Sequence, residues 1–96
     1  MEETPEHIID IHKVENLLKN GKYSSVSEYL EEKLTKEEKI LNSKVVNLVM
    51  KELDEIRNLL PQYKPKGKNP FSFRKIDYAQ ILLNIEYYKK RLSEEA

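Results

Sequence analysis

The chain has 96 residues, of which 39% are hydrophobic and 35% are charged, and its 17 cations and 17 acids give a formal net charge of zero. This length predicts one domain over residues 1–96, with a core small enough that a partner or a second copy often completes it. The absence of cysteine excludes disulfides, cysteine-ligated zinc and thiol nucleophiles. Without an apolar leader or a run of eighteen apolar residues, the chain is expected to be cytoplasmic and not to span a membrane.

The first helix is predicted over residues 5–20. Thr4 followed by Pro5 has the form of a helix start, with a side-chain acceptor at the N-cap and a proline where its missing N–H does no harm. The pair Asn20-Gly21 supplies the stop, because glycine readily adopts the left-handed conformation that ends helices. Between these signals apolar residues recur at helical spacing: Ile8, Ile11, Val14, Leu17 and Leu18.

The second helix is predicted to begin near residue 25. Ser25 and Glu28 have the spacing of a capping box, in which each side chain bonds a backbone N–H of the first turn. A second capping box begins at Thr35, where the apolar stripe ends, and indicates a break in the helix there. The stripe before that break consists of Val26, Tyr29, Leu30 and Leu34.

The third helix is predicted over residues 36–60. The alternative is a continuous second helix that ends near Asn42-Ser43, because helix boundaries are the least certain part of a sequence-based assignment. The third helix carries the longest apolar stripe of the chain, which consists of Leu41, Val45, Val49, Leu53, Ile56 and Leu60 and is widened by Val46, Leu48 and Met50.

Residues 61–75 interrupt the helical pattern. This segment, here called the basic segment, holds three of the four prolines, both phenylalanines, five cations and no acid. Prolines at positions 61, 65 and 70 are incompatible with a regular helix, so a long loop is predicted.

A fourth helix is predicted after the loop, with a buried stripe of Tyr78, Ile81, Leu82, Ile85, Tyr88 and Leu92 that Ile76, Leu83 and Tyr87 are expected to broaden. No stretch alternates with period two for long enough to predict a strand. The predicted fold class is all-α: a four-helix bundle-like single domain with a long basic, proline-rich loop between helices 3 and 4.

The basic segment is the candidate functional site. A loop that is both basic and aromatic offers phosphate contacts and flat stacking surfaces together, and its charges would equally suit an acidic protein partner. The alternative is a solvated connector whose phenylalanines plug the end of the bundle. The candidate contact residues are Tyr63, Lys64, Lys66, Lys68, Phe71, Phe73, Arg74 and Lys75.

Catalysis is not expected. His7 and His12 are five residues apart, which on a helix turns their side chains about 140° from each other and prevents a shared metal. No serine, threonine or lysine stands in a nucleophile motif, and two glycines do not make a phosphate-binding loop. We therefore expect no enzyme activity, cofactor, metal or small-molecule substrate.

Residues 17–34 join a first helix, through a glycine and an aromatic, to a Ser-x-Ser-Glu helix start. This run resembles the turn and second helix of ribbon-helix-helix repressors and antitoxins. In that family the paired second helices bind phosphate and a preceding strand reads the major groove, so the resemblance implies a dimeric DNA-binding regulator. The matching residues are Gly21, Tyr23, Ser25, Ser27 and Glu28, with Leu18, Leu30 and Leu34 at apolar positions.

Two departures from that pattern are visible. Where the family has a basic strand, the chain begins with the short acidic run Met1-Glu2-Glu3-Thr4-Pro5-Glu6, and Glu31 and Glu32 lie near the place of a cation in the second helix. The primary hypothesis is therefore a small non-enzymatic helical accessory or adaptor subunit of a nucleic-acid-handling assembly, acting in replication, repair or transcription through the basic segment. Such a subunit is expected to have a protein partner or to self-associate. The alternative is a regulator or antitoxin of the ribbon-helix-helix type.

Overall fold

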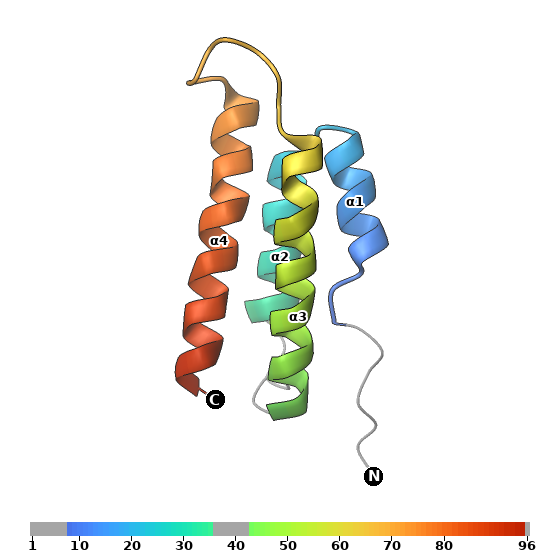
Figure 1. Ribbon diagram of the computed structural model, residues 1–96, viewed down its shortest axis with the longest axis vertical. Helices are drawn as coiled ribbons and strands as arrows, with labels where there is room; N and C mark the ends of the chain where they lie inside the picture. The colour runs from blue at the N-terminus through green and yellow to red at the C-terminus, as the bar shows by residue number, and fades with distance from the viewer. Residues whose placement is uncertain (1–7, 36–42, 96) are drawn as a thin grey trace.

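The computed structural model of the protein describes residues 8–35 and 43–95. Within these ranges the chain forms four α-helices, one short 3-10 helix and no strand, which confirms the predicted all-α class for this part of the chain. None of the described helices is both long enough and apolar enough to cross a membrane. Figure 1 shows the elements in chain order: α1 (Ile11–Lys19), α2 (Tyr23–Thr35), α3 (Ser43–Leu59), η2 (Leu60–Tyr63) and α4 (Phe73–Glu95).

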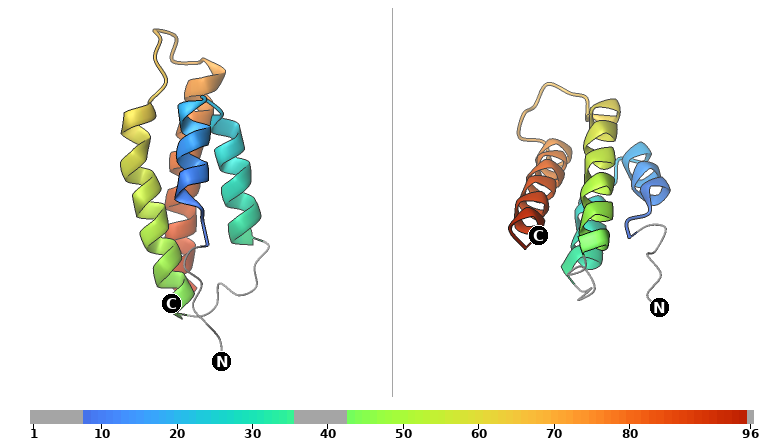
Figure 2. Two further views of the ribbon diagram at one scale, coloured as in Figure 1. Left: turned by 90° about the vertical axis from the view of Figure 1, so that its right-hand side faces the viewer. Right: turned by 60° about the horizontal axis from the view of Figure 1, so that its bottom comes forward.

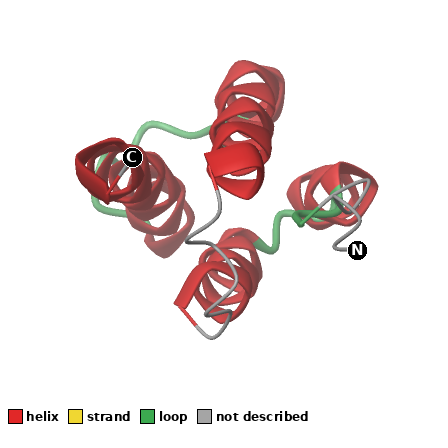
Figure 3. Ribbon diagram, turned by 90° about the horizontal axis from the view of Figure 1, so that it is seen from below, coloured by secondary structure: helices red, strands yellow, loops and turns green. Residues whose placement is uncertain are grey.

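α2 and α3 lie between α1 and α4 (Figure 3). α1 packs against α2 and α3 from one side, and α4 packs against the same two helices from the other side (Figure 3). The turn between α1 and α2 and the connection between η2 and α4 lie at the same end, shown at the top of Figure 1 and in both views of Figure 2. This end therefore collects the C-termini of α1 and α3 and the N-termini of α2 and α4.

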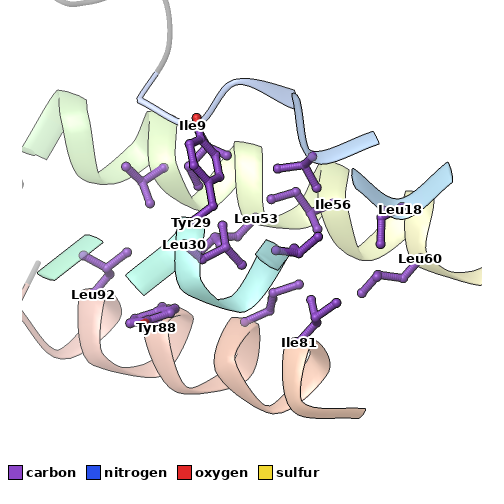
Figure 4. Close-up of a cluster of buried hydrophobic side chains, with 14 of the residues drawn as sticks. Ile9, Leu18, Tyr29, Leu30, Leu53, Ile56, Leu60, Ile81, Tyr88 and Leu92 are labelled. Carbon is purple, nitrogen blue, oxygen red and sulfur yellow. The ribbon is translucent and has the colours of Figure 1, made fainter. Parts of the chain in front are cut away.

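One apolar core joins the helices, with side chains from all four directed into it (Figure 4). In the stripe predicted for the third helix, Val45, Val46, Val49, Leu53, Ile56 and Leu60 are buried. Leu48 and Met50, which were expected to widen the stripe, are only partly buried, and Leu41 lies outside the described residues. Full burial of one such side chain contributes about 1.5–3 kcal/mol. The fully buried members from α3, η2 and α4 are Val49, Leu53, Ile56, Leu60, Ile81 and Ile85.

The outer side of α4 does not follow the prediction. Ile76, Leu83 and Tyr87 were expected to broaden the buried face, but they are 49%, 64% and 57% exposed. The prediction is wrong because α4 packs against α2 and α3 on one side only, the side that carries the fully buried Ile81 and Ile85. The opposite side of α4 therefore carries apolar side chains in contact with solvent.

α1 begins later than predicted. Its first residue is Ile11, and the N-cap is Asp10, whose Oδ1 accepts hydrogen bonds from the N–H groups of His12 (3.1 Å) and Lys13 (3.3 Å). The predicted start at residue 5 is thus wrong for residues 8–10, which are not helical, and the proposed cap at Thr4 lies outside the described residues.

The chain before α1 is held by a buried carboxylate of α3. Glu52, which is 4% exposed, accepts the backbone N–H of Ile8 at 3.0 Å (Oε1) and that of Ile9 at 3.2 Å (both oxygens). The Tyr29 hydroxyl of α2 accepts the N–H of Asp10 at 2.9 Å. Because these donors are bonded to side chains of α2 and α3, residues 8–10 cross the core without forming a helix, and Ile9 is fully buried.

The turn between α1 and α2 is a Schellman motif. Gly21 has a φ of +69°, its N–H donates to Leu18 O (3.1 Å), and the N–H of Lys22 donates to Leu17 O (2.9 Å). The predicted role of Gly21 as the stop of the first helix agrees with this geometry.

α2 starts at Tyr23, two residues before the predicted start. The N–H of Val26 donates to Lys22 O (3.3 Å), so the first helical turn forms directly after the Gly21 turn. Ser25 consequently lies inside the helix rather than at its N-cap, and the capping-box prediction is wrong. α2 is described up to Thr35, while the predicted start of the third helix at residue 36 and its alternative both fall outside the described residues.

The left-handed turn at Gly21 gives a first testable prediction. A Cβ at this position would meet Arg74 Cζ at 3.8 Å, an ordinary contact, so the cost of Gly21→Ala is the backbone conformation alone, about 1–2 kcal/mol. Gly21→Asn should cost less, because asparagine tolerates this conformation better. Urea unfolding of the parent and both variants measures the difference. Equal stability of the alanine and asparagine variants would show that the turn is not left-handed.

Candidate functional site

The basic segment is less irregular than predicted. Pro61 and Tyr63 belong to η2, and residues 73–75 form the first turn of α4, so only residues 64–72 lack helical structure. Pro61 fits because it stands in the first turn of the 3-10 helix, where a missing N–H costs nothing. At the other end, the carbonyl of Ser72 accepts the N–H of Ile76 at 3.1 Å and starts α4.

Tyr63 fixes the start of the segment to α1 and α2. The Tyr23 hydroxyl donates to Tyr63 O at 2.7 Å, and the half-buried Tyr63 donates its own hydroxyl to Glu15 Oε2 at 3.3 Å. The Tyr23 ring also packs edge-on against Tyr78, with 5.8 Å between ring centroids. Burial raises the pKa of the Tyr78 phenol above its usual value, with a smaller contribution from Tyr23, so this phenol stays neutral in the packed site.

Both phenylalanines of the basic segment point into solvent. Phe71 is 78% exposed and Phe73 is 85% exposed, so the alternative in which they plug the end of the bundle is wrong. Phe73 is at the start of α4 on its outer side, about 140° around the helix from the buried Tyr78. The N–H of Phe71 donates to Asn69 Oδ1 at 3.0 Å, which closes a tight turn and carries this ring away from the core.

One cation of the basic segment is hydrogen-bonded within the protein. Lys75 is half-buried and its Nζ donates to the carbonyl of Gly67, which ties the loop to the first turn of α4. The other four cations of the segment, like its two phenyl rings, are exposed: Lys64, Lys66, Lys68 and Arg74.

The structure adds a cation that sequence reasoning missed. The Arg74 guanidinium lies beside Gly21, with Cζ 3.8 Å from the position that a Cβ would occupy there. The next residue, Lys22, is exposed. Gly21 and Arg74 are 53 positions apart in the sequence, so the fold places the turn that contains Gly21 and precedes Lys22 beside the basic segment.

Side-chain charges determine the electrostatic character of this end. Two helix N-termini and two helix C-termini meet there, so the helix dipoles largely offset each other. The nearby acid Glu15 is occupied by the Tyr63 hydroxyl and by Lys19, whose Nζ is 3.8 Å from Glu15 Oε1. The surface around residues 64–74 is therefore cationic and aromatic at once, which suits a polyanion that has exposed flat rings.

Two of the residues that resemble the ribbon-helix-helix pattern have structural roles here: Gly21 forms the Schellman turn, and Tyr23 is buried in the core. A third, Ser27, has a buried hydroxyl that makes no hydrogen bond. The strand that the resemblance requires would fall on residues 1–7, outside the described residues.

Within residues 8–35 and 43–95, no group of three or more histidine, cysteine, aspartate or glutamate side chains is placed to hold a metal ion. His12 is exposed on α1, whereas His7 lies outside these ranges. Comparison of the chain with models of protein families, with curated proteins and with solved structures finds no match in any of the three.

Proposed function

We propose that the protein is a small, non-enzymatic, bundle-like accessory subunit that binds single-stranded nucleic acid through the basic segment, within a cytoplasmic nucleic-acid-handling assembly. The observation that carries this proposal is the exposure of Phe71 (78%) and Phe73 (85%) between exposed cations. Two large exposed apolar side chains two positions from each other in or beside one loop can form the kind of surface that marks a binding site.

The two kinds of side chain have separate tasks. Lysine and arginine neutralise phosphates and release condensed counterions, which binds any sequence. A phenyl ring stacks on an unpaired base and contributes about 1–3 kcal/mol per base. In a duplex the bases are already stacked on one another, so the rings gain nothing there, and a preference for single strands follows.

The loop is held in few conformations, which favours binding. Pro65 and Pro70 fix their backbone φ angles, Tyr63 is bonded to α1 and α2, and Lys75 is bonded to Gly67. A loop with few conformations loses little entropy when a ligand orders it.

Salt dependence tests the phosphate contacts. For three to five contacts with a single strand, the slope of log K against log salt concentration should be about −2 to −4. The triple change Lys66→Gln, Lys68→Gln and Arg74→Gln should flatten this slope by about 2. A control with the same charge change, Lys44→Gln, Lys51→Gln and Lys90→Gln, should leave the slope near that of the parent. Fluorescence anisotropy with a labelled oligonucleotide measures both, at protein concentrations too low for self-association.

The aromatic contacts have their own test. Phe71→Ala and Phe73→Ala should each weaken single-strand binding about 5- to 150-fold, the range that 1–3 kcal/mol implies, at an unchanged melting temperature. Binding to a duplex of the same sequence should change little. If the unmodified protein binds neither single nor double strands at about 50 mM salt, the proposal is refuted, and the surface would instead suit an acidic protein partner.

The alternative, a ribbon-helix-helix regulator or antitoxin, has one observation in its favour: α1 and α2 are joined by the glycine turn that the resemblance implies. It requires the residues before α1 to pair as strands in an obligate dimer. Backbone NMR chemical shifts of residues 1–7 decide between the two functions, because strand shifts would support the regulator and their absence would exclude it.

A further inference from the structure

The exposed apolar side chains of the described residues are concentrated on one helix. The large hydrophobic residues that remain exposed are Phe71, Phe73, Ile76, Leu83 and Tyr87, and all but Phe71 belong to α4. At 100° per residue, positions 73, 76, 80, 83 and 87 fall within an arc of about 80°. We call this row the outer seam. It consists of Phe73, Ile76, Gln80, Leu83 and Tyr87, of which only Gln80 is not apolar.

The outer seam lies opposite the buried side of α4, which packs on α2 and α3 (Figure 3). A helix that is apolar on two opposite sides is normally covered on both. Two polar side chains at the seam already have partners: Glu86, beside it, is paired with Arg57 of α3 at 2.9 Å, and Gln80 Nε2 donates to Asn84 Oδ1 at 2.8 Å. The outer seam is thus apolar at four of its five positions, and the side chains of Gln80 and Glu86 are bonded to other residues of the same chain.

The spacing of the seam indicates that its occupant is a helix. The steps between its members are three, four, three and four residues, which is the a/d repeat of a coiled coil. Such a row packs into the grooves of another helix at a small crossing angle.

We propose that the outer seam binds the outer seam of a second copy of this chain, with the two α4 helices antiparallel. In antiparallel pairs an a residue packs against a d residue of the other helix. Centring the two copies on residues 81–82 sets Ile76 of one copy against Tyr87 of the other and Gln80 against Leu83. Each of these two pairs contains at least one large apolar side chain, and the twofold symmetry of the dimer generates a second copy of each pair.

The charges at the two ends of α4 favour an antiparallel over a parallel arrangement of the two helices. A parallel pair would place the two basic segments side by side, with Lys90 facing Lys90 of the other copy, and such like charges repel. The antiparallel pair separates the basic segments to opposite ends. It also sets Phe73 against Lys90 of the other copy, where the aliphatic stem covers the ring and the ammonium lies near its face.

The short length of the outer seam limits the affinity with which two copies associate. From position 73 to position 90 the helix rises about 26 Å, and one helix from each copy buries a small interface. Interfaces of this size give weak or transient complexes, so we expect self-association in the micromolar range rather than a permanent dimer.

Analytical ultracentrifugation of the full chain between about 1 µM and 1 mM tests the self-association. The parent should shift from one copy to two over this range. Leu83→Glu should remain a single chain throughout, because the pair would bury two unpaired carboxylates, whereas the exposed Ser93→Glu, outside the seam, should behave as the parent. Far-UV circular dichroism should be the same for all three. A parent that stays a single chain at about 1 mM overturns the proposal, whatever other protein the seam binds.

Cross-linking tests the direction, and the chain has no cysteine of its own to interfere. Under mild oxidation Ile76→Cys and Tyr87→Cys should form a disulfide when the two variants are mixed, and little when each is alone. Cross-linking of each variant with itself, without the mixed product, would show a parallel pair and refute the antiparallel arrangement.

Discussion

Replacement of Leu53 by alanine should lower the free energy of unfolding by about 2–5 kcal/mol. Leu53 is fully buried in the middle of α3, where neighbouring helices surround the site and leave a cavity that cannot collapse (Figure 4). Ile85→Ala, at the equivalent place on α4, should cost a similar amount. For a domain of this size each kcal/mol lowers the melting temperature by about 4–8 °C, so both variants should melt at least about 8 °C below the parent.

A matched control is Leu83→Ala, the same chemical change on α4 at a position that is 64% exposed. Measured at concentrations where parent and variants are single chains, it should change the stability by no more than about 0.5 kcal/mol. If Leu53→Ala and Leu83→Ala melt at similar temperatures, the buried faces assigned to α3 and α4 are wrong.

Periodicity in the sequence was sufficient to place the core. Most members of the stripes that contain Leu53 and Ile85 are buried as predicted, because a residue every three or four positions must face the same side of a helix; Leu82 is only partly buried, and Leu41 lies outside the described residues. The same reasoning failed for Ile76 and Leu83, since periodicity reveals which residues share a side but not whether a neighbour covers it. Only the placement of α4 at the edge of the fold exposes that second side.

The composition of the sequence identified the residues of the candidate site, but it did not predict their geometry. Prolines and cations identified residues 61–75, but they left open whether Phe71 and Phe73 are buried or exposed. That depends on the rotation of α4 against α2 and α3, which is a tertiary property. Lys22 was missed for a related reason, because the contact of the preceding Gly21 with Arg74 depends on the packing of α2 against α4.

Glu52 is the clearest example of a residue that sequence could not single out. It lies on the predicted stripe of the third helix, three residues after Val49 and four before Ile56, where an apolar side chain would be expected, yet it is a carboxylate and is buried. Its partners are backbone N–H groups 43 and 44 positions away. Backbone donors have no sequence signature, so this contact and the late start of α1 that accompanies it became visible only in the fold.

Glu52→Ala should therefore be strongly destabilising. Removal of the carboxylate leaves the N–H groups of Ile8 and Ile9 without these acceptors, and an unsatisfied buried donor costs about 1–3 kcal/mol. Glu52→Gln keeps one oxygen acceptor without the charge and should lose less, because hydrogen bonds to neutral groups are about half as strong as those to charged ones. Chemical denaturation of the three proteins should give the order parent, glutamine variant, alanine variant.

The control is Glu55→Ala, which removes an exposed carboxylate one helical turn further along α3 and should stay within about 0.5 kcal/mol of the parent. Amide hydrogen exchange identifies the cause. In Glu52→Ala the amides of Ile8 and Ile9 should lose their protection before those of Val49 and Ile56, because residues 8–10 detach from α3 before the core opens. Equal protection of the Ile8 and Ile9 amides in Glu52→Ala and in Glu55→Ala would mean that the carboxylate does not hold this segment, and the start of α1 would then need another cause.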